Sequence, residues 1–159
     1  MSDELKNLPN FEARIDTILP IIKERINKFA DVKEMEVAGD LQYFFTDSSY
    51  DSALLLCAEK QRKGKESMVV ADLEPVYTNL KSIISQMGDP STFAPESVKE
   101  AIWPYAEQEG RGLVLWALRT ALSGRERSPD PFTLVSIFGK EEAIRRIDIA
   151  LQKIHESAQ

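Results

Sequence analysis

Residues 118–151 read LRTALSGRERSPDPFTLVSIFGKEEAIRRIDIAL and contain the signals of three helices in succession. The first, apolar segment ends at Gly124, and glycine is the residue that most often follows the end of a helix. Ser128 followed by Pro129 is typical of a helix start, with serine as the N-cap and proline at the first helical position. Gly139 then ends this short helix, and a last amphipathic helix follows it. The stretch therefore predicts helices that are joined by short turns.

Helical spacing continues through the rest of the chain. Residues 67–87 show it most clearly, because their apolar side chains recur every three or four positions. Pro20 and Pro104 are each expected to restart or kink a helix, and Asp31 is expected to cap one. Further helices are expected over residues 11–19, 20–29, 31–45, 48–60, 95–109 and 111–123. Since no alternating strand pattern is sustained, except for a trace at 67–70, the sequence predicts an all-α protein.

A loop-forming segment interrupts these helices at residues 88–97, GDPSTFAPES. It contains one glycine and two prolines within ten residues, which is typical of a break between packed elements. The sequence therefore predicts two small helical subdomains, residues 1–90 and residues 91–159, that divide near residues 88–95.

The charge distribution is uneven. The net charge of −6 argues against a protein that binds nucleic acid by bulk attraction. Residues 111–127, however, contain four arginines and one glutamate, which is a local surplus of three positive charges. A second basic run at 59–66, EKQRKGKE, is interpreted as a solvated helix end and loop.

Residues for catalysis are scarce in this sequence. It has no glycine-rich phosphate loop, no cysteine pair and no His-Glu helix motif. Cys57 lies among leucines and is expected to be buried, and His155 is expected to lie on the surface. We therefore expect no catalytic residue, no metal site and no cofactor. The single cysteine and the lack of a signal peptide or spanning segment favour a cytoplasmic protein with no membrane partner.

The stretch 118–151 resembles the C-terminal end of bacterial-type glutamyl-tRNA synthetases. In that family an arginine follows Pro-Leu, a Thr-Gly pair ends the helix, Ser/Thr-Pro closes a polar turn, and Leu-Gly-Lys-Glu precedes a helix that contains Arg-Arg-Ile. The matching features here are Leu118-Arg119, Ser123-Gly124, Ser128-Pro129, Phe138-Gly139-Lys140-Glu141 and Arg145-Arg146-Ile147. Upstream, PIIKERINKFAD and LQYFFTDSSYD also resemble family segments, so the resemblance covers nearly the whole chain, most clearly at 111–154.

Several positions depart from the family pattern. Ala117 stands where proline is usual, Ser123 replaces threonine, and Pro131 replaces an apolar residue such as leucine. The active-site signatures His-Ile-Gly-His and Lys-Met-Ser-Lys-Ser are absent from the sequence. The resemblance therefore implies the anticodon-binding portion alone, either cut from a longer protein or encoded separately.

The resemblance also implies partners and site residues. The partners would be a glutamate-accepting tRNA and the catalytic domain of the same enzyme, with the chain acting as a monomer. The residues implied in contact with the anticodon are Arg119, Ser128, Pro129, Pro131 and, on a less extensive match, Arg25. The residues placed to meet RNA phosphates are Arg125, Arg127 and Arg111.

Purely structural alternatives exist for these side chains. Arg119 could pair with a carboxylate such as Glu126, and Arg25 could form a pair within its own helix. Trp103 and Trp116 lie on apolar faces and are expected to belong to the core. As a whole, the chain could also be a helical protein-interaction module without an RNA ligand.

Overall fold

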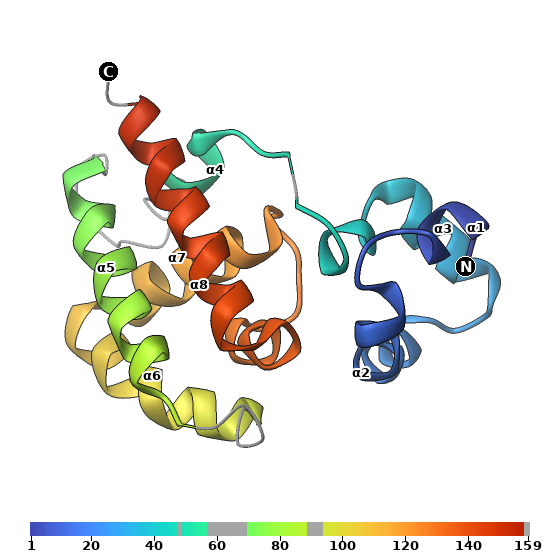
Figure 1. Ribbon diagram of the computed structural model, residues 1–159, viewed down its shortest axis with the longest axis horizontal. Helices are drawn as coiled ribbons and strands as arrows, with labels where there is room; N and C mark the ends of the chain where they lie inside the picture. The colour runs from blue at the N-terminus through green and yellow to red at the C-terminus, as the bar shows by residue number, and fades with distance from the viewer. Residues whose placement is uncertain (48, 57–69, 89–93, 158–159) are drawn as a thin grey trace. The chain divides into compact units, whose positions relative to one another are not determined.

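The structure, a computed structural model, describes residues 1–47, 49–56, 70–88 and 94–157 of the 159-residue chain (Figure 1). These residues form eight α-helices and one 3-10 turn and contain no strand. The prediction of an all-α protein is thus confirmed for this part of the chain. None of the helices formed by these residues is both long enough and apolar enough to cross a bilayer.

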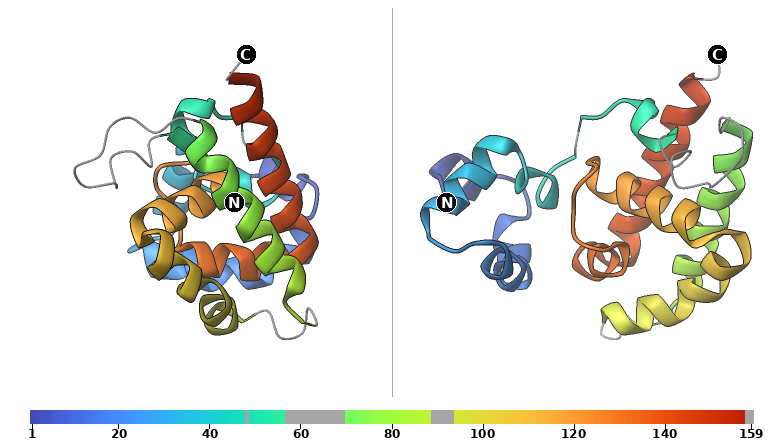
Figure 2. Two further views of the ribbon diagram at one scale, coloured as in Figure 1. Left: turned by 90° about the vertical axis from the view of Figure 1, so that its left-hand side faces the viewer. Right: turned by 180° about the vertical axis from the view of Figure 1, so that it is seen from behind.

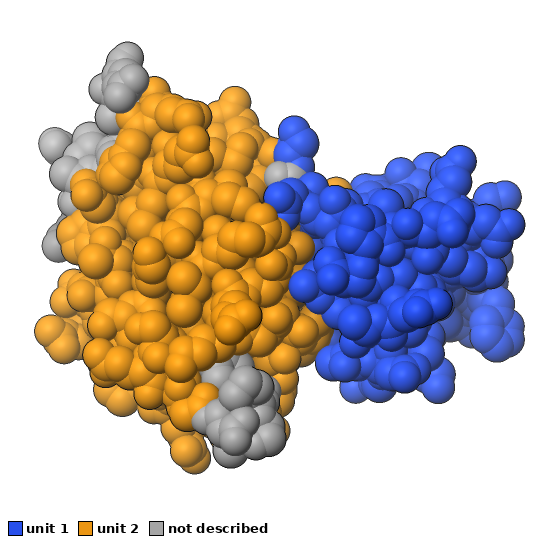
Figure 3. All heavy atoms as spheres, in the orientation of Figure 1, with its two compact units in different colours: residues 1–49 blue, residues 50–159 orange. Residues whose placement is uncertain are grey.

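The chain divides into two compact units, residues 1–49 and residues 50–159 (Figure 3). This division lies upstream of the boundary near 88–95 that the loop composition predicts. The reason is that helix α5 (Val70–Gln86), which precedes the predicted boundary, packs against helices α7 (Arg111–Ser123) and α8 (Pro131–Ser157) that follow it. Residues 89–93 of the predicted boundary lie outside the described residues.

Unit 1 contains helices α1 (Asp3–Lys6), α2 (Phe11–Arg25) and α3 (Ala30–Ala38) and the 3-10 turn η1 (Gln42–Phe44). Helix α2 runs through Pro20 without the expected restart. A proline inside a helix removes one hydrogen bond. The helix nevertheless stays continuous here, and the side chains two residues before and after the proline, Ile18 and Ile22, are both buried.

Asp31 is not the N-cap of α3, because that helix already begins at Ala30. Instead its carboxylate accepts the backbone N–H groups of Asn27 (2.8 Å) and Lys28 (3.1 Å), which closes the turn before the helix. These two hydrogen bonds favour the charged form and lower the pKa of Asp31. Helix α3 ends at Ala38, with Gly39 as its C-cap, well before the end predicted at residue 45.

Unit 2 contains α4 (Ser52–Leu56), α5, α6 (Pro95–Glu109), α7 and α8. Helices α5 and α8 run side by side in Figures 1 and 2. Helix α7 packs against all four of the others, and most of its residues are buried. Inside this core the hydroxyl of Tyr77 donates to the carbonyl of Ala117 (3.0 Å), and burial raises the pKa of Tyr77.

Three local predictions in unit 2 meet different outcomes. Helix α6 continues through Pro104 rather than restarting there. The helix expected from residue 48 begins at Ser52 instead, because Asp51 caps α4 by accepting the N–H of Ala53 (2.9 Å); residue 48 lies outside the described residues. Gly139 interrupts α8 with φ 77° and ψ 173°, so the predicted stop at this glycine is confirmed.

A buried arginine holds the end of α7 against α8. The side chain of Arg146 is 4% exposed, and its Nη1 donates to the carbonyl of Leu122 (2.7 Å). Its Nε donates to Glu142 (3.0 Å), and its guanidinium lies 4.0 Å from the ring centroid of Phe138. Because Phe138 and Arg146 lie on opposite sides of the break at Gly139, this one side chain joins both segments of α8 to α7.

We predict that Arg146→Ala lowers the free energy of unfolding by about 3 kcal/mol, because it leaves the buried carbonyl of Leu122 and the carboxylate of Glu142 with fewer partners. Arg145→Ala is the matched control, since Arg145 binds the same Glu142 from an exposed position and should cost at most about 1 kcal/mol. Urea unfolding of both variants measures the difference. Equal losses of stability would contradict the role of Arg146.

A pH dependence follows from the same carboxylate. Hydrogen bonds from Arg145, and then from Arg146, hold the pKa of Glu142 below its ordinary value of 4.5 despite partial burial. An acid with a lowered pKa in the folded state stabilises the protein above its unfolded pKa, and loses this effect as the pH falls through the folded value. We therefore expect Glu142→Gln to be less stable than the wild type at pH 7, and the difference to shrink below pH 4.5. A difference that stayed constant from pH 7 to pH 3 in urea unfolding would argue against this linkage.

Candidate nucleic-acid interface

Helix α7 presents one of its faces to solvent and the other to the core. It begins after Gly110, whose φ of 114° favours glycine, so α6 and α7 can join without a longer connection. The buried face contains Leu113, Val114, Ala117, Leu118, Ala121 and Leu122. Gly112, Leu115, Trp116 and Arg119, spaced by three and four residues, line a hollow on the opposite face.

The hollow has a volume of about 350 Å³. Arg111 and Pro131 complete its lining, so two guanidinium groups and one indole surround a mainly apolar surface. None of the described residues that line it is acidic.

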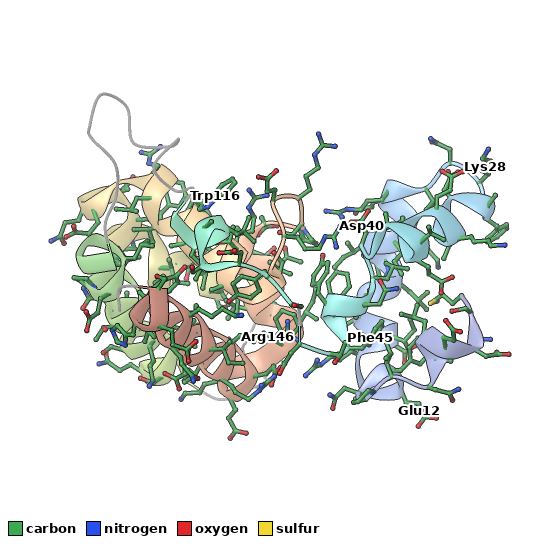
Figure 4. The ribbon with its side chains drawn as sticks, turned by 90° about the horizontal axis from the view of Figure 1, so that it is seen from above. Glu12, Lys28, Asp40, Phe45, Trp116 and Arg146 are labelled. Carbon is green, nitrogen blue, oxygen red and sulfur yellow. The ribbon has the colours of Figure 1, made fainter. Side chains whose placement is uncertain are left out.

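Arg119 lies over the indole of Trp116, with its guanidinium carbon 5.2 Å from the ring centroid. The indole itself is held by a hydrogen bond from its Nε1 to the carbonyl of Leu54 (3.2 Å) (Trp116 is labelled in Figure 4). Among the described residues Arg119 forms no ion pair with Glu126, so that alternative is not found; its guanidinium lies over the aromatic ring instead. A guanidinium at this distance from a half-buried indole makes a cation–π contact with the ring face.

The turn after α7 is ordered by Ser123 and Gly124. Gly124 has the left-handed conformation (φ 66°), and its N–H donates to the carbonyl of Thr120 (2.7 Å). The buried hydroxyl of Ser123 donates to the carbonyl of Arg119 (2.8 Å) and accepts the N–H of Arg125 (3.1 Å). These hydrogen bonds therefore hold the first residues of the turn that contains Arg125 and Arg127.

Asp130, rather than Ser128, caps the helix that follows this turn. The carboxylate of Asp130 accepts the backbone N–H of Thr133 (3.0 Å) and the hydroxyl of the same residue (2.6 Å), and α8 begins at Pro131. Ser128 donates its hydroxyl to the carbonyl of Pro129 (2.9 Å). The predicted start at Ser128 and Pro129 is therefore wrong by two residues. Both Ser-Pro and Asp-Pro have the chemistry of a helix start, and Asp130 is the one that bonds to the first turn of α8.

The structure brings together three of the predicted site residues, Arg119, Pro131 and Arg111, in the hollow. In the adjoining turn Ser128 and Arg125 are half-buried, Arg127 is exposed and Pro129 is buried. Arg25 is the last residue of α2, in unit 1; it is exposed, and the described residues show no ion pair for it.

Trp116 was expected in the core but is half-buried and lines the hollow. Trp103 is half-buried as well. The available signal was spacing, because Trp116 precedes Arg119 by three residues and therefore shares its helical face. His155 is exposed, as expected, with Nε2 3.4 Å from Glu74. Cys57 and the basic run at 59–66 lie outside the described residues.

An indole, two guanidinium groups and an apolar floor suit a flat ligand that carries negative charge. Unstacked nucleotide bases bind in this way, stacked on aromatic or guanidinium planes and bonded along their edges. Arg127, in the turn between α7 and α8, is a further exposed cation. The geometry therefore defines a helical domain whose hollow has the chemistry of a single-stranded nucleic-acid site.

Comparison with known proteins agrees with this class. Residues 3–151 match the family model described as the anticodon binding domain, so the chain belongs to that family. A glutamate–tRNA ligase of Lachnoclostridium phytofermentans is 26% identical over 157 residues, which cover 97% of this chain and 29% of that protein. A glutamate–tRNA ligase of Anaeromyxobacter sp. (strain K) is 33% identical over 119 residues, which cover 74% of this chain and 22% of that protein.

A solved structure is similar as well. The crystal structure of a glutamate tRNA ligase from Elizabethkingia meningosepticum in complex with its amino acid matches with a TM-score of 0.56 and 26% identity. The match covers 95% of this chain and 30% of that one. The chain thus spans less than a third of the length of these relatives, and the family resemblance seen in the sequence is confirmed.

We predict that Asp130→Ala lowers the free energy of unfolding by about 1 kcal/mol, since it removes the N-cap of α8. Ser128→Ala, the matched control two residues earlier, should change stability less, because its hydroxyl bonds only to the neighbouring Pro129 carbonyl. Thermal unfolding of the two variants measures this order. A larger loss for Ser128→Ala would place the cap back at residue 128.

Proposed function

We propose that this chain recognises the anticodon of a glutamate-accepting tRNA, as the RNA-binding part of a glutamate–tRNA ligase whose catalysis is supplied by a separate catalytic domain. The observation that carries the proposal is the hollow in which the guanidinium of Arg119 lies over the indole of Trp116, beside Arg111 and Pro131. Family membership supports it, because the family model describes an anticodon binding domain. The same finding disfavours a protein-interaction module. In this proposal the chain acts in the cytoplasm as a monomer.

Arg119 is the residue that reads a base. Its guanidinium offers donors in a rigid planar fork, so it can stack on a base or bond two acceptors along a base edge. The indole of Trp116 behind it limits the directions in which the fork can point. An arginine that is held in place loses less conformational entropy on binding than a free one, and this favours specific recognition.

The turn and the proline pair shape the site around that arginine. Ser128 uses its hydroxyl hydrogen within the turn, so its oxygen remains able to accept a hydrogen bond from a base amino group. Pro131 lines the hollow, whereas the buried Pro129 acts by positioning the turn. Arg125 and Arg127 contact phosphates, which adds affinity without sequence preference.

Arg25 remains a candidate for the first anticodon base. It is exposed at the end of α2 in unit 1, so its guanidinium is accessible to RNA. Its assignment rests on the resemblance of the segment 20–31 to the family.

The test is a titration of the 159-residue chain with a glutamate tRNA and with the same tRNA carrying a changed anticodon. We expect the wild type to prefer the native anticodon and Arg119→Ala to lose about 1–3 kcal/mol of that preference, by analogy with base readout in duplexes. Arg119→Lys keeps the charge but not the planar fork, so it should lose the preference and retain most of the salt dependence. Filter binding over a range of salt concentrations measures both quantities.

Arg145→Ala is the control for lost charge, because Arg145 is exposed on α8 and pairs with Glu142, outside the hollow. It should leave the anticodon preference unchanged. Arg127→Ala should reduce the slope of log affinity against log salt by about 0.7, one phosphate contact on a single strand, without altering the preference. Equal binding of both tRNAs by the wild type would refute the proposed function.

A further inference from the structure

A second aromatic group with cations above it lies beside the hollow. Trp103, in α6, is half-buried, and both Lys99 Nζ and the guanidinium carbon of Arg111 lie 4.9 Å from its ring centroid. Lys99 and Arg111 are both exposed. A tryptophan that served only the core would be covered by apolar side chains rather than by two solvated cations.

Glu107 contacts both the indole and one of the two cations. One of its oxygens, Oε1, accepts both the indole N–H of Trp103 (2.9 Å) and Nη2 of Arg111 (3.1 Å). The two cations and the one carboxylate leave a surplus of one positive charge at the ring. Since the indole N–H is already bonded within the protein, the ring has only its face to offer to a ligand.

The cluster is continuous with the hollow. Arg111 lies over the indole of Trp103 and also lines the hollow that contains Arg119. Phe132 lies 6.3 Å from Trp103, centroid to centroid, and directly follows Pro131, another residue of the lining. Trp103 in α6 and Trp116 in α7 each have a guanidinium above the ring. Arg111 connects the two sites, because it lies over Trp103 and also lines the hollow beside Trp116.

We propose that Trp103, Lys99 and Arg111 form a second stacking site, which holds the nucleotide next to the base read by Arg119. The inference rests on the proposed function and deepens it. The base lies on the face of Trp103, and the displaced cations pair with its flanking phosphates. Every base has a flat face, and stacking on a ring face does not distinguish one base from another, so this site is tolerant of sequence. It increases affinity and fixes the path of the strand, while the hollow determines specificity.

The sequence contains two tryptophans, which makes a direct test available. In Trp116→Phe, all indole fluorescence comes from Trp103, and in Trp103→Phe it comes from Trp116. We expect saturating glutamate tRNA to quench the emission of Trp103 and to protect it from acrylamide, with the native and with the changed anticodon alike. Circular dichroism of each variant without RNA establishes that it is folded.

Affinity is the second measurement. Trp103→Leu removes the stacking face and should weaken binding of both tRNAs about 5-fold to 150-fold, with their ratio unchanged. Trp103→Phe keeps an aromatic face and should recover most of the affinity. Arg111→Gln should reduce the salt slope by about 0.7, while Lys81→Gln, an exposed cation paired with Asp148 away from the hollow, should not.

The outcomes separate this inference from the proposed function. A wild type that prefers the native anticodon, together with unchanged Trp103 emission in the saturated complex and wild-type affinity of Trp103→Leu, would overturn the second stacking site alone. Quenching of Trp103 by every RNA, with no anticodon preference, would overturn the anticodon proposal and keep the stacking site. Absence of RNA binding by the folded wild type would overturn both.

Discussion

The turn between α7 and α8 depends on the contacts of one buried side chain, the guanidinium of Arg146. It is a buried charge, and a buried charge is tolerated only when its partners are complete. Here the partners are the carbonyl of Leu122, the carboxylate of Glu142 and the ring of Phe138. These three partners lie at the end of α7 and on both sides of the break in α8. The contacts of Arg146 therefore hold the helices at both ends of the turn.

Helix α7 contributes one face to the core of unit 2 and the opposite face to the lining of the hollow. Its buried residues pack against α4, α5, α6 and α8, and the hydroxyl of Tyr77 bonds to the carbonyl of Ala117 in the middle of that face. The opposite face places Trp116 and Arg119 in the hollow. A helix packed on four neighbours cannot rotate without disrupting the core, and this constraint sets the direction in which Arg119 points.

Charge is distributed so that attraction is local. The chain as a whole is acidic, with a net charge of −6, whereas residues 111–127 carry four arginines and one glutamate. A polyanion is therefore repelled by the molecule on average and attracted at one surface. Under the proposed function, such an arrangement would limit non-specific binding of RNA and leave recognition to stacking and hydrogen bonds at that surface.

Much of the fold could be predicted from the sequence, because helix periodicity, glycine stops and proline starts act over a few residues. Gly124 and Gly139 ended their helices where the sequence placed them, and the apolar spacing of 67–87 found α5. The residue types of the candidate site, above all Arg119, could be named because a family motif has fixed spacing.

Other features were decided only by tertiary structure. Ser128 and Asp130 are each followed by proline, and both are residue types that cap helices, so the local sequence does not distinguish them as the N-cap of α8. Asp130 is the cap because its carboxylate reaches Thr133 in the folded turn. The exposure of Trp116 and Trp103 depends on which neighbours cover them, and helical spacing alone does not specify those neighbours. The division at residues 49 and 50 arises because α5 packs on α7 and α8, across the loop that composition marked as the boundary. Local sequence determined the helices and their ends, and long-range packing determined which faces were left for a ligand.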